Sequence, residues 1–345
     1  MFLDRRAFLH TSLASATAAL LRPHLLHSEE KPALKLASFR VDVSPPMNHP
    51  LCGGWIKPVS GLDDTEEAIG LVITGAGAPI VLVAVDWTGI LNTAHQTWRQ
   101  VLAQAAGTTP DRVAVQCVHQ HNAPFACLDA EQIVTAQKDL PHTVLVDFFE
   151  TSLEKTAKAL SAAMKNLRPV THVATGQAKV EKVAGNRRFL NEQGIVSDWR
   201  GSASKNPTHW ELPEGLIDPW LKTVAFYDGE TKLAACHYYA THPMSYYGDG
   251  RVSSDFVGLA RKRRQLDEPG CTHLYFTGCS GNIAAGKYND GTPKARVELT
   301  DRIYAGIVAS EQQLTKQPIE RASWQTENLL LTPRSTLNEE SLMDQ

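Results

Sequence analysis

The chain has 345 residues, enough for one large α/β domain or two smaller ones. Hydrophobic residues make up 43% and charged residues 21%, which is ordinary for a globular protein with a substantial core, and the net charge of −3 gives no reason to expect a nucleic acid or an anionic membrane as partner. The six cysteines include no CxxC pair, so neither a disulfide scaffold nor a thiolate zinc cluster is expected.

Residues 1–30 have the composition of an export signal. Asp4, Arg5 and Arg6 precede the weakly apolar, alanine-rich run SLASATAALL, and polar residues follow it. The adjacent arginines followed by Phe8 and Leu9 resemble a twin-arginine signal, which predicts an exported protein of the periplasm or cell envelope. The alternative is a cytosolic protein with a frayed amphipathic helix at its terminus. No other stretch is long and apolar enough to predict a transmembrane segment.

The first half of the domain reads as strands followed by a helix. The segment LKLASFRVDVSPP predicts a strand that stops at two prolines, and a polar loop follows up to Thr65. The apolar runs AIGLVITGA and PIVLVAVDW predict two strands. A helix is expected over Asn92–Ala106, ended by Gly107, and then a buried strand over 112–118.

The second half repeats this mixture of elements without a visible sequence repeat. We expect a helix over 143–166, a strand over 170–183, a polar loop over 192–215 and a hairpin around Asp228-Gly229. A helix from Ser253 or Ser254 to about Arg264, a strand over 272–277, a helix over 294–315 and a strand over 319–332 complete the chain. This pattern predicts an α/β fold with mixed β-sheets flanked by helices, in a single large domain over residues 33–335.

Three histidines are the strongest chemical signal. His119 and His121 follow a buried strand, and residues i and i+2 of a strand share one face, so both imidazoles are expected to point the same way. His242 follows a second apolar stretch in a comparable place. Neutral imidazole is a common zinc ligand, which makes His119 and His242 the best candidate ligands; the alternative is a set of hydrogen-bonded loop histidines.

Polar residues gather in three loops at expected strand ends, 119–124, 241–255 and 277–289. Ligands of open α/β folds bind at strand termini, so these loops are expected to converge. A catalytic zinc site needs about three protein ligands. Asp86, Asp249 and Asp255 are candidates for the third, and each is equally interpretable as a helix cap or loop residue.

Read together, four segments resemble the N-terminal catalytic domain of the neutral, non-lysosomal ceramidase family. FRVDVSPP is similar to the family's D-[IV]-[ST]-P motif, and VHQHNAP to its H-T-H-S-G-P zinc motif. YYATHPMSYY with SSDFVG is similar to its H-P/G-T and [SN]-x-D-x-x-G segment, and FTGCSGNIAAGKYN stands where the family has G-D-V-S-P-N. The match covers residues 35–320, and the ordered set is more specific than any single motif.

The resemblance implies an amide hydrolase that uses Zn²⁺, with zinc-activated water as the nucleophile. It implies that His119 and His242 bind the metal and that His121 either supports the metal ligands or acts as a catalytic histidine beside the attacked carbonyl. Arg187, in a segment similar to the family's N-R pair, would hold a substrate oxygen or stabilise developing charge; the alternative for Arg187 and Arg188 is a solvated surface pair. The substrate would be a small-molecule or lipid-like amide, with a role in lipid metabolism.

The sequence departs from the family at two places. Ala284 stands where the family has its active-site serine, and alanine has no hydroxyl to attack or donate. Ser280 lies four residues earlier and defines a serine-hydrolase alternative, although no G-x-S-x-G motif is present. The family's remaining ligands, a Glu and a Tyr, come from further downstream, so either the domain is truncated or the third ligand comes from elsewhere. The competing hypothesis is a non-catalytic cell-envelope binding protein that keeps a degenerate pocket.

Overall fold

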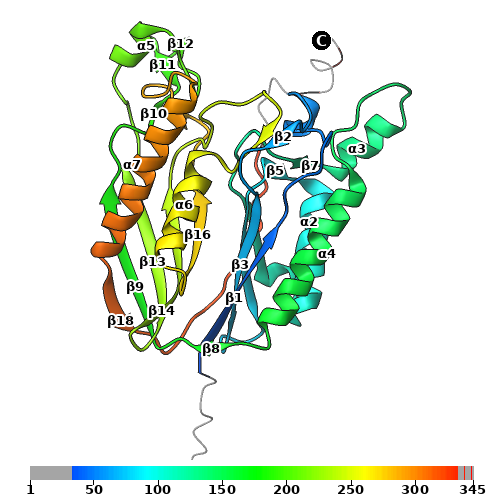
Figure 1. Ribbon diagram of the computed structural model, residues 1–345, viewed down its shortest axis with the longest axis vertical. Helices are drawn as coiled ribbons and strands as arrows, with labels where there is room; N and C mark the ends of the chain where they lie inside the picture. The colour runs from blue at the N-terminus through cyan, green and yellow to red at the C-terminus, as the bar shows by residue number, and fades with distance from the viewer. Residues whose placement is uncertain (1–32, 333–337, 339–342, 344–345) are drawn as a thin grey trace, which may run out of the picture. The chain divides into compact units, whose positions relative to one another are not determined.

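The computed structural model describes residues 33–332 together with 338 and 343. Two five-stranded mixed sheets pack between helices within one unit (Figure 1). The predicted α/β class, with mixed sheets flanked by helices, is confirmed. The export signal expected over residues 1–30 lies outside the described residues and stays a prediction.

The first sheet has the strand order β6-β4-β3-β1-β8. Its pairs are antiparallel except β4 with β6, which run parallel because the crossover helix α2 connects them. The elements of this half are β1 (Lys35–Asp42), β3 (Glu67–Thr74), β4 (Ile80–Val85), α2 (Asn92–Ala106), β6 (Val113–Cys117), α3 (Leu128–Thr135), α4 (Val146–Ala163) and β8 (Arg168–Pro169).

The second sheet has the order β16-β14-β13-β9-β18, and again only the edge pair, β14 with β16, is parallel. The elements of this half are β9 (His172–Lys179), β13 (Trp220–Asp228), β14 (Thr231–Tyr239), α6 (Asp255–Asp267), β16 (Thr272–Thr277), α7 (Pro293–Gln312) and β18 (Thr315–Pro318). When the five strands of each sheet are numbered in chain order, both sheets have the strand order 4-3-2-1-5. The fold therefore repeats one topology, although the sequence has no visible repeat.

Shorter elements lie in the connections between these strands and helices. They are β2 (Gly61–Leu62), β5 (Gly89–Ile90), β7 (Phe125–Ala126), β10 (Gly185–Asn186), β11 (Arg188–Leu190), β12 (Val196–Trp199), α5 (Pro207–Glu211), β15 (Arg251–Val252) and β17 (Ile283–Ala284), with single-turn 3-10 helices at Cys52–Gly54 and Pro110–Arg112. These connections carry the polar loops in which the sequence concentrates its chemistry.

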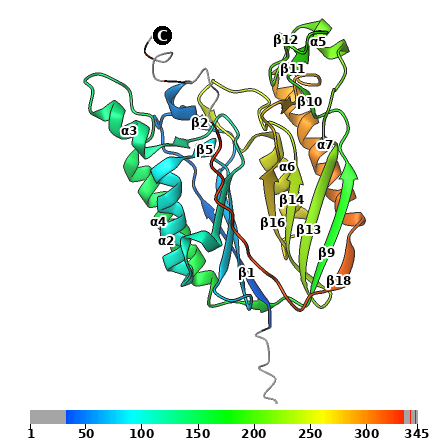
Figure 2. The same cartoon turned by 180° about the vertical axis from the view of Figure 1, so that it is seen from behind.

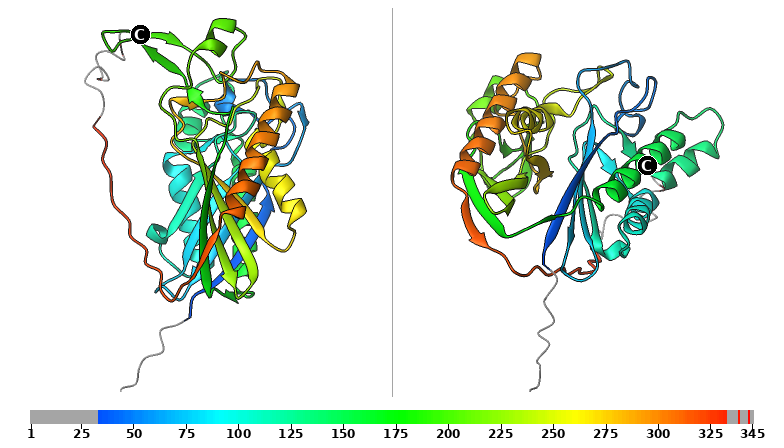
Figure 3. Two further views of the ribbon diagram at one scale, coloured as in Figure 1. Left: turned by 90° about the vertical axis from the view of Figure 1, so that its left-hand side faces the viewer. Right: turned by 60° about the horizontal axis from the view of Figure 1, so that its bottom comes forward.

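Two apolar layers hold the sheets and helices together. One cluster joins the first sheet to α2 and α4 through residues such as Val83, Trp98 and Phe149. The larger cluster contains residues of both sheets, such as Leu71 and Leu274, together with residues of α6 and α7. Figure 3 shows α2 and α4 on the outer side of the first sheet and α7 on the outer side of the second. This packing brings the ends of β6, β14 and β16 to one region of the molecule.

Several predicted elements match the structure closely, and two are wrong. The polar loop expected over 192–215 contains β12 and α5. Helix α2 spans Asn92–Ala106 as expected, because Gly107 adopts the left-handed conformation that closes a helix end. The strand predicted over 319–332 is instead β18, Thr315–Pro318, and the residues after it have no regular structure. Figure 2 shows this last segment running back toward the first half, where the Trp324 indole donates to the Asp111 carbonyl at 2.7 Å.

Among the described residues, no helix combines the length and the apolar character that spanning a membrane requires.

Candidate metal centre

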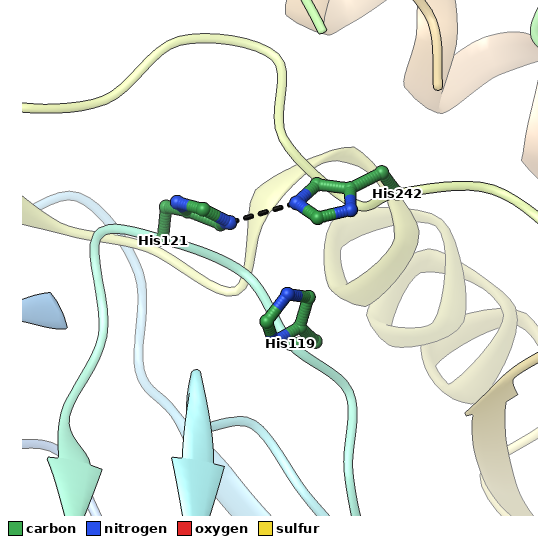
Figure 4. Close-up of side chains that lie close together, drawn as sticks. All are labelled: His119, His121 and His242. Atoms are coloured by element: carbon green, nitrogen blue, oxygen red, sulfur yellow. Dashed lines mark hydrogen bonds between the residues drawn. The ribbon is translucent and has the colours of Figure 1, made fainter. Parts of the chain in front are cut away.

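His119, His121 and His242 come together as a group, as Figure 4 shows. Their candidate ligand nitrogens lie within 4.8 Å of one another. The ring centroids are 5.2 Å apart for His119 and His121, 4.7 Å for His119 and His242, and 4.9 Å for His121 and His242. The expected convergence of the loops after β6 and β14 is therefore observed.

The route to this convergence differs from the one predicted. Strand β6 ends at Cys117, so neither His119 nor His121 belongs to a strand. His119 has a φ of +80°, a left-handed conformation that is rare for residues other than glycine. Because the chain turns at His119, the two rings meet across a loop and at an interplanar angle of 73° rather than side by side on one strand face.

Main-chain contacts fix one tautomer of His119. Its Nδ1 lies 2.6 Å from the Thr88 carbonyl, which can only accept a hydrogen bond, so Nδ1 carries the proton and Nε2 carries the lone pair. The Thr88 hydroxyl shares its one proton between the carbonyls of Gln120 and Ala123, at 2.7 and 3.1 Å, and holds the loop in place. A histidine that donates one N–H to a carbonyl and offers the other nitrogen has the arrangement usual for metal ligands.

His121 and His242 face each other directly. Their Nε2 atoms are 2.8 Å apart, so in the absence of a cation one must donate a proton to the other. The other nitrogen of His121 lies 3.8 Å from the Cys52 thiol sulfur. Nδ1 of His242 is buried without a hydrogen bond of ordinary geometry. Two opposed ring nitrogens and a third lone pair nearby form a set that a bound cation would satisfy.

Burial keeps two of these histidines neutral. Desolvation, with smaller contributions from His119 and Arg187, lowers the pKa of His121 to about 4. Desolvation, followed by the neighbouring His121 and His119, lowers the pKa of His242 to about 3, although the main chain at Ser280 offsets part of this change. Neutral imidazole is the form that binds metal ions, so no proton has to be displaced from these rings near pH 7.

Arg187 and Tyr247 border the histidines. Arg187 connects β10 to β11, and its guanidinium lies 4.4 Å from the centre of the Trp199 ring. Its Nε is buried without a hydrogen-bond partner, and burial followed by the charge of Arg188 lowers its pKa. The Tyr247 ring lies 5.2 Å from the ring of His121. Arg187 therefore brings an incompletely paired positive charge to the group, whereas Arg188 is exposed.

Ala284 lies directly behind His242. The main-chain N–H of His242 donates to the Ile283 carbonyl at 2.8 Å, and Ala284 forms an isolated bridge with His242 and pairs with Gly185. Only 1% of Ala284 is exposed. The position compared with the family's serine is thus next to the histidines, but its side chain offers them no polar group.

The three candidate carboxylate ligands are engaged elsewhere. Asp86 pairs with Arg261 at 2.8 Å, Asp249 accepts from the Asn122 amide at 2.8 Å, and Asp255 accepts from the main chain of Ser245 at 2.9 Å. None of them belongs to the group formed by the three histidines. The ring of His121 lies 5.2 and 4.9 Å from the rings of His119 and His242, which makes it the candidate third ligand; the sequence analysis gave it a catalytic role instead.

Sequence reasoning missed Cys52 and Tyr247. Tyr247 could have been noticed, because it lies five residues after His242 in the same polar loop. Cys52 gave no signal: it lies in a loop that reads as surface, yet it is 5% exposed and reaches His121 across 69 positions of sequence. A separate cavity of about 900 Å³, lined by Phe148 and other residues of α3 and α4, contains none of the three histidines.

No family model matches the sequence, and no curated protein matches it either. The fold does have counterparts among solved structures. The crystal structure of neutral ceramidase from Pseudomonas aeruginosa superposes with a TM-score of 0.61 at 16% identity, covering 82% of this chain and 46% of that one. The chain has the fold of neutral ceramidase. A ceramidase complexed with C2 gives a TM-score of 0.58 at 15% identity, covering 82% of this chain and 45% of that one.

The likeness confirms, at the level of the fold, the resemblance that the sequence motifs indicated. This chain spans less than half the length of either ceramidase. The structure therefore establishes the fold and the grouping of the three histidines, and the reaction is a proposal.

Proposed function

We propose that this protein is an exported, zinc-dependent hydrolase of an amide or related acyl bond. The observation that carries the proposal is the convergence of three imidazoles whose ligand nitrogens lie within 4.8 Å of one another. The fold shared with two ceramidase structures supports a small-molecule or lipid-like amide as the substrate class. The composition of residues 1–30 supports export to the periplasm or cell envelope.

The three histidines have different hydrogen-bond partners, so we assign them different roles. His119 and His242 would hold the ion, since His119 presents a lone pair at Nε2 and Nε2 of His242 faces into the group, 2.8 Å from Nε2 of His121. A bound zinc ion would lower the pKa of a water molecule toward neutrality and polarise the carbonyl to be attacked. Nδ1 of His121 contacts a thiol rather than a carbonyl, so that contact does not fix which ring nitrogen carries the proton. His121 therefore either completes the ligand set or transfers a proton at Nε2.

Arg187 would orient the substrate. Its guanidinium is held over Trp199 and its Nε lacks a partner, so it can donate to a carbonyl or hydroxyl oxygen of the substrate. A donor of this kind stabilises negative charge that develops on the attacked carbonyl oxygen. Its charge also lowers the pKa values of His121 and His242, after the larger effects of burial and of the neighbouring histidines, which supports a role beside them.

A second candidate function is a non-catalytic binding protein of the cell envelope. Ala284 favours it, because the buried side chain behind His242 has no hydroxyl. In that case the histidines would still hold a metal ion and the pocket would bind an amide without cleaving it.

Hydrolysis of a panel of short- and long-chain N-acyl amides distinguishes the two functions. We expect the zinc-loaded protein to release the acyl product, a chelator to abolish release, and added zinc to restore it. The double variant His119→Ala, His242→Ala should be inactive, whereas His95→Ala, at a histidine of α2 that contacts the Val115 carbonyl, should keep the activity. Binding of the amides by a zinc-loaded protein that cleaves none of them would overturn the hydrolase proposal.

A further inference from the structure

A second pair of histidines lies inside the second sheet, away from the loops of the first group. His237 is on β14 and His273 is on the neighbouring parallel strand β16. Both side chains are fully buried, and their rings stack at 5.3 Å with an interplanar angle of 7°. Burial strongly disfavours the charged form of imidazole, so both rings are neutral.

A chain of hydrogen bonds sets the tautomer of His237. The Ser310 hydroxyl donates its one proton to the Ile307 carbonyl at 2.8 Å. In the 2.6 Å contact between Ser310 and Thr223, the proton must therefore come from Thr223. Having used its proton, the Thr223 hydroxyl can only accept from Nδ1 of His237, 2.9 Å away.

The same logic extends to His273. A neutral His237 with its proton on Nδ1 has a lone pair on Nε2, which accepts from Nδ1 of His273 at 3.0 Å. Neutral His273 is then left with a lone pair on Nε2. That atom is buried and has no hydrogen-bond partner. The chain of donors thus ends on an unsatisfied acceptor, which is costly in a protein interior.

The neighbours of this lone pair are themselves metal-ligating groups. Candidate ligand atoms of Glu268, Cys271 and His273 lie within 4.8 Å of one another. Oε2 of Glu268 is 3.3 Å from Nε2 of His273, without the geometry of a hydrogen bond. The buried Cys271 thiol makes only a weak contact with the Thr272 carbonyl at 3.9 Å. A lone pair facing a carboxylate is repulsive unless a cation lies between them.

The surrounding charges allow a cation to bind here. Lys232 contacts both Glu268 and Glu311 at 2.7 Å, and Arg264 also pairs with both carboxylates, so these four charges balance. The contacts of Glu268 with these cations use Oε2, so Oε1 is available to a further ligand partner. Loss of the Cys271 proton would add the negative charge that offsets part of the charge of a divalent ion.

We propose that Glu268, Cys271 and His273 form a second zinc site, distinct from the three-histidine group. Thiolate, imidazole and carboxylate are the ligand types that zinc takes in proteins. Binding forms bonds from the metal to the Cys271 sulfur, the His273 nitrogen and the Glu268 carboxylate. The thiol proton passes to solvent, and no atom changes oxidation state.

Hydrogen bonds of a glutamine side chain hold the polypeptide around the site in place. The Gln265 side chain accepts from the main chain of His273 at 3.0 Å and donates to the Cys271 carbonyl at 2.7 Å. This clamp holds the turn that joins α6 to β16. A metal bound there would fix the turn against β14 and α7, a structural role rather than a catalytic one.

Cobalt binding tests the proposal, because a cobalt–thiolate bond gives an ultraviolet charge-transfer band that histidine and carboxylate ligands lack. Metal-free, reduced protein titrated with Co²⁺ should show this band, saturating at about one ion per chain. The band should persist in the double variant His119→Ala, His242→Ala, and in Cys52→Ser, and it should vanish in Cys271→Ser. A wild-type protein without the band, or a Cys271→Ser protein that keeps it, would overturn the proposal.

Glu268→Gln provides a second variant in case Cys271→Ser does not fold, since the Glu268 side chain is 29% exposed and at the surface end of the site. We expect it to weaken Co²⁺ binding by about 10-fold or more, the scale on which changes around a metal site act. An unchanged affinity in this variant also contradicts the site. Because the first histidine group is absent from the double variant, failure of this proposal and failure of the proposed function are separable.

Discussion

The two histidine groups differ in what holds them. His119, His121 and His242 lie on loops beyond strand ends, and the Thr88 carbonyl fixes the tautomer of His119. His237 and His273 lie on the strands themselves, and an unbroken chain of hydrogen bonds fixes the proton positions of both. The first group borders partly exposed residues such as Tyr247, whereas the second is sealed in the sheet.

This difference separates two uses of the same side chain. Imidazoles on loops at strand ends can meet a substrate and can exchange protons with each other. Imidazoles on the strands of a sheet are held rigidly, and a ligand that binds them contributes to the stability of the fold. The duplicated topology makes the contrast direct, because each half places its parallel edge strand, β6 or β16, beside one of the two groups.

The largest effect on activity, short of removing the histidines, should come from Arg187. If its guanidinium stabilises charge on the substrate, Arg187→Ala should lower kcat by about 100- to 1,000-fold, the usual effect of deleting such a donor. Arg188→Ala is the matched control, since Arg188 is the exposed next residue, at the start of β11, and it should change kcat little. Equal losses in both variants would show that general positive charge, and not Arg187, matters.

Acid should destabilise the protein through His237 and His273, the two buried histidines of the second sheet. Burial lowers the pKa of His237 to about 4 and that of His273 to about 2, while both titrate near 6.5 in the unfolded chain. As the pH falls from 6.5 to about 4, the unfolded chain binds more protons than the folded one, so the free energy of unfolding decreases. For His237 alone the loss is on the order of 3 kcal/mol. Urea unfolding of chelator-treated protein at several pH values measures it.

A variant pair checks the origin of this acid sensitivity. His273→Gln should flatten the dependence of the unfolding free energy on pH over this window. His172→Gln, at a partly exposed histidine of the same sheet, should leave the dependence as it is in the wild type. An unchanged slope in His273→Gln would mean that other groups dominate acid unfolding.

A smaller effect is expected at Cys52. Its thiol contacts Nδ1 of His121 and helps to orient that ring, so Cys52→Ala should reduce activity by about 10-fold. Cys52→Ser, which restores a hydrogen-bonding group, should recover part of the loss. Cys127→Ala removes another buried thiol and serves as the control. If Cys52→Ser and Cys52→Ala are equally impaired, the thiol contact does not position His121.

Local patterns in the sequence predicted much of the fold because they report local structure. The periodicity of α2 and the glycine after it predicted that helix, and β-branched runs predicted β4 and β6. Pairing between distant strands leaves no such local trace, so the repeated topology was not predicted. Leu329, Leu330 and Leu331 lie in the segment predicted as a final strand, but all three are exposed and pair with no sheet.

The candidate site was predictable in part for the same reason. Positions at strand ends identified His119, His121 and His242, because such ends converge in α/β folds. The left-handed turn at His119 and the approach of Cys52 depend on contacts between segments far apart in sequence. The three aspartates could not be excluded beforehand, since their partners, such as Arg261 for Asp86, also come from distant elements.

Anomalous diffraction at the zinc edge, on crystals grown with zinc, tests the central claim most directly. The account predicts a strong peak among the ring nitrogens of His119, His121 and His242, which disappears in the variant His119→Ala, His242→Ala. A second peak beside Cys271 should remain in that variant. The absence of any peak among the three histidines in zinc-saturated crystals would contradict the metal centre and the hydrolase built on it.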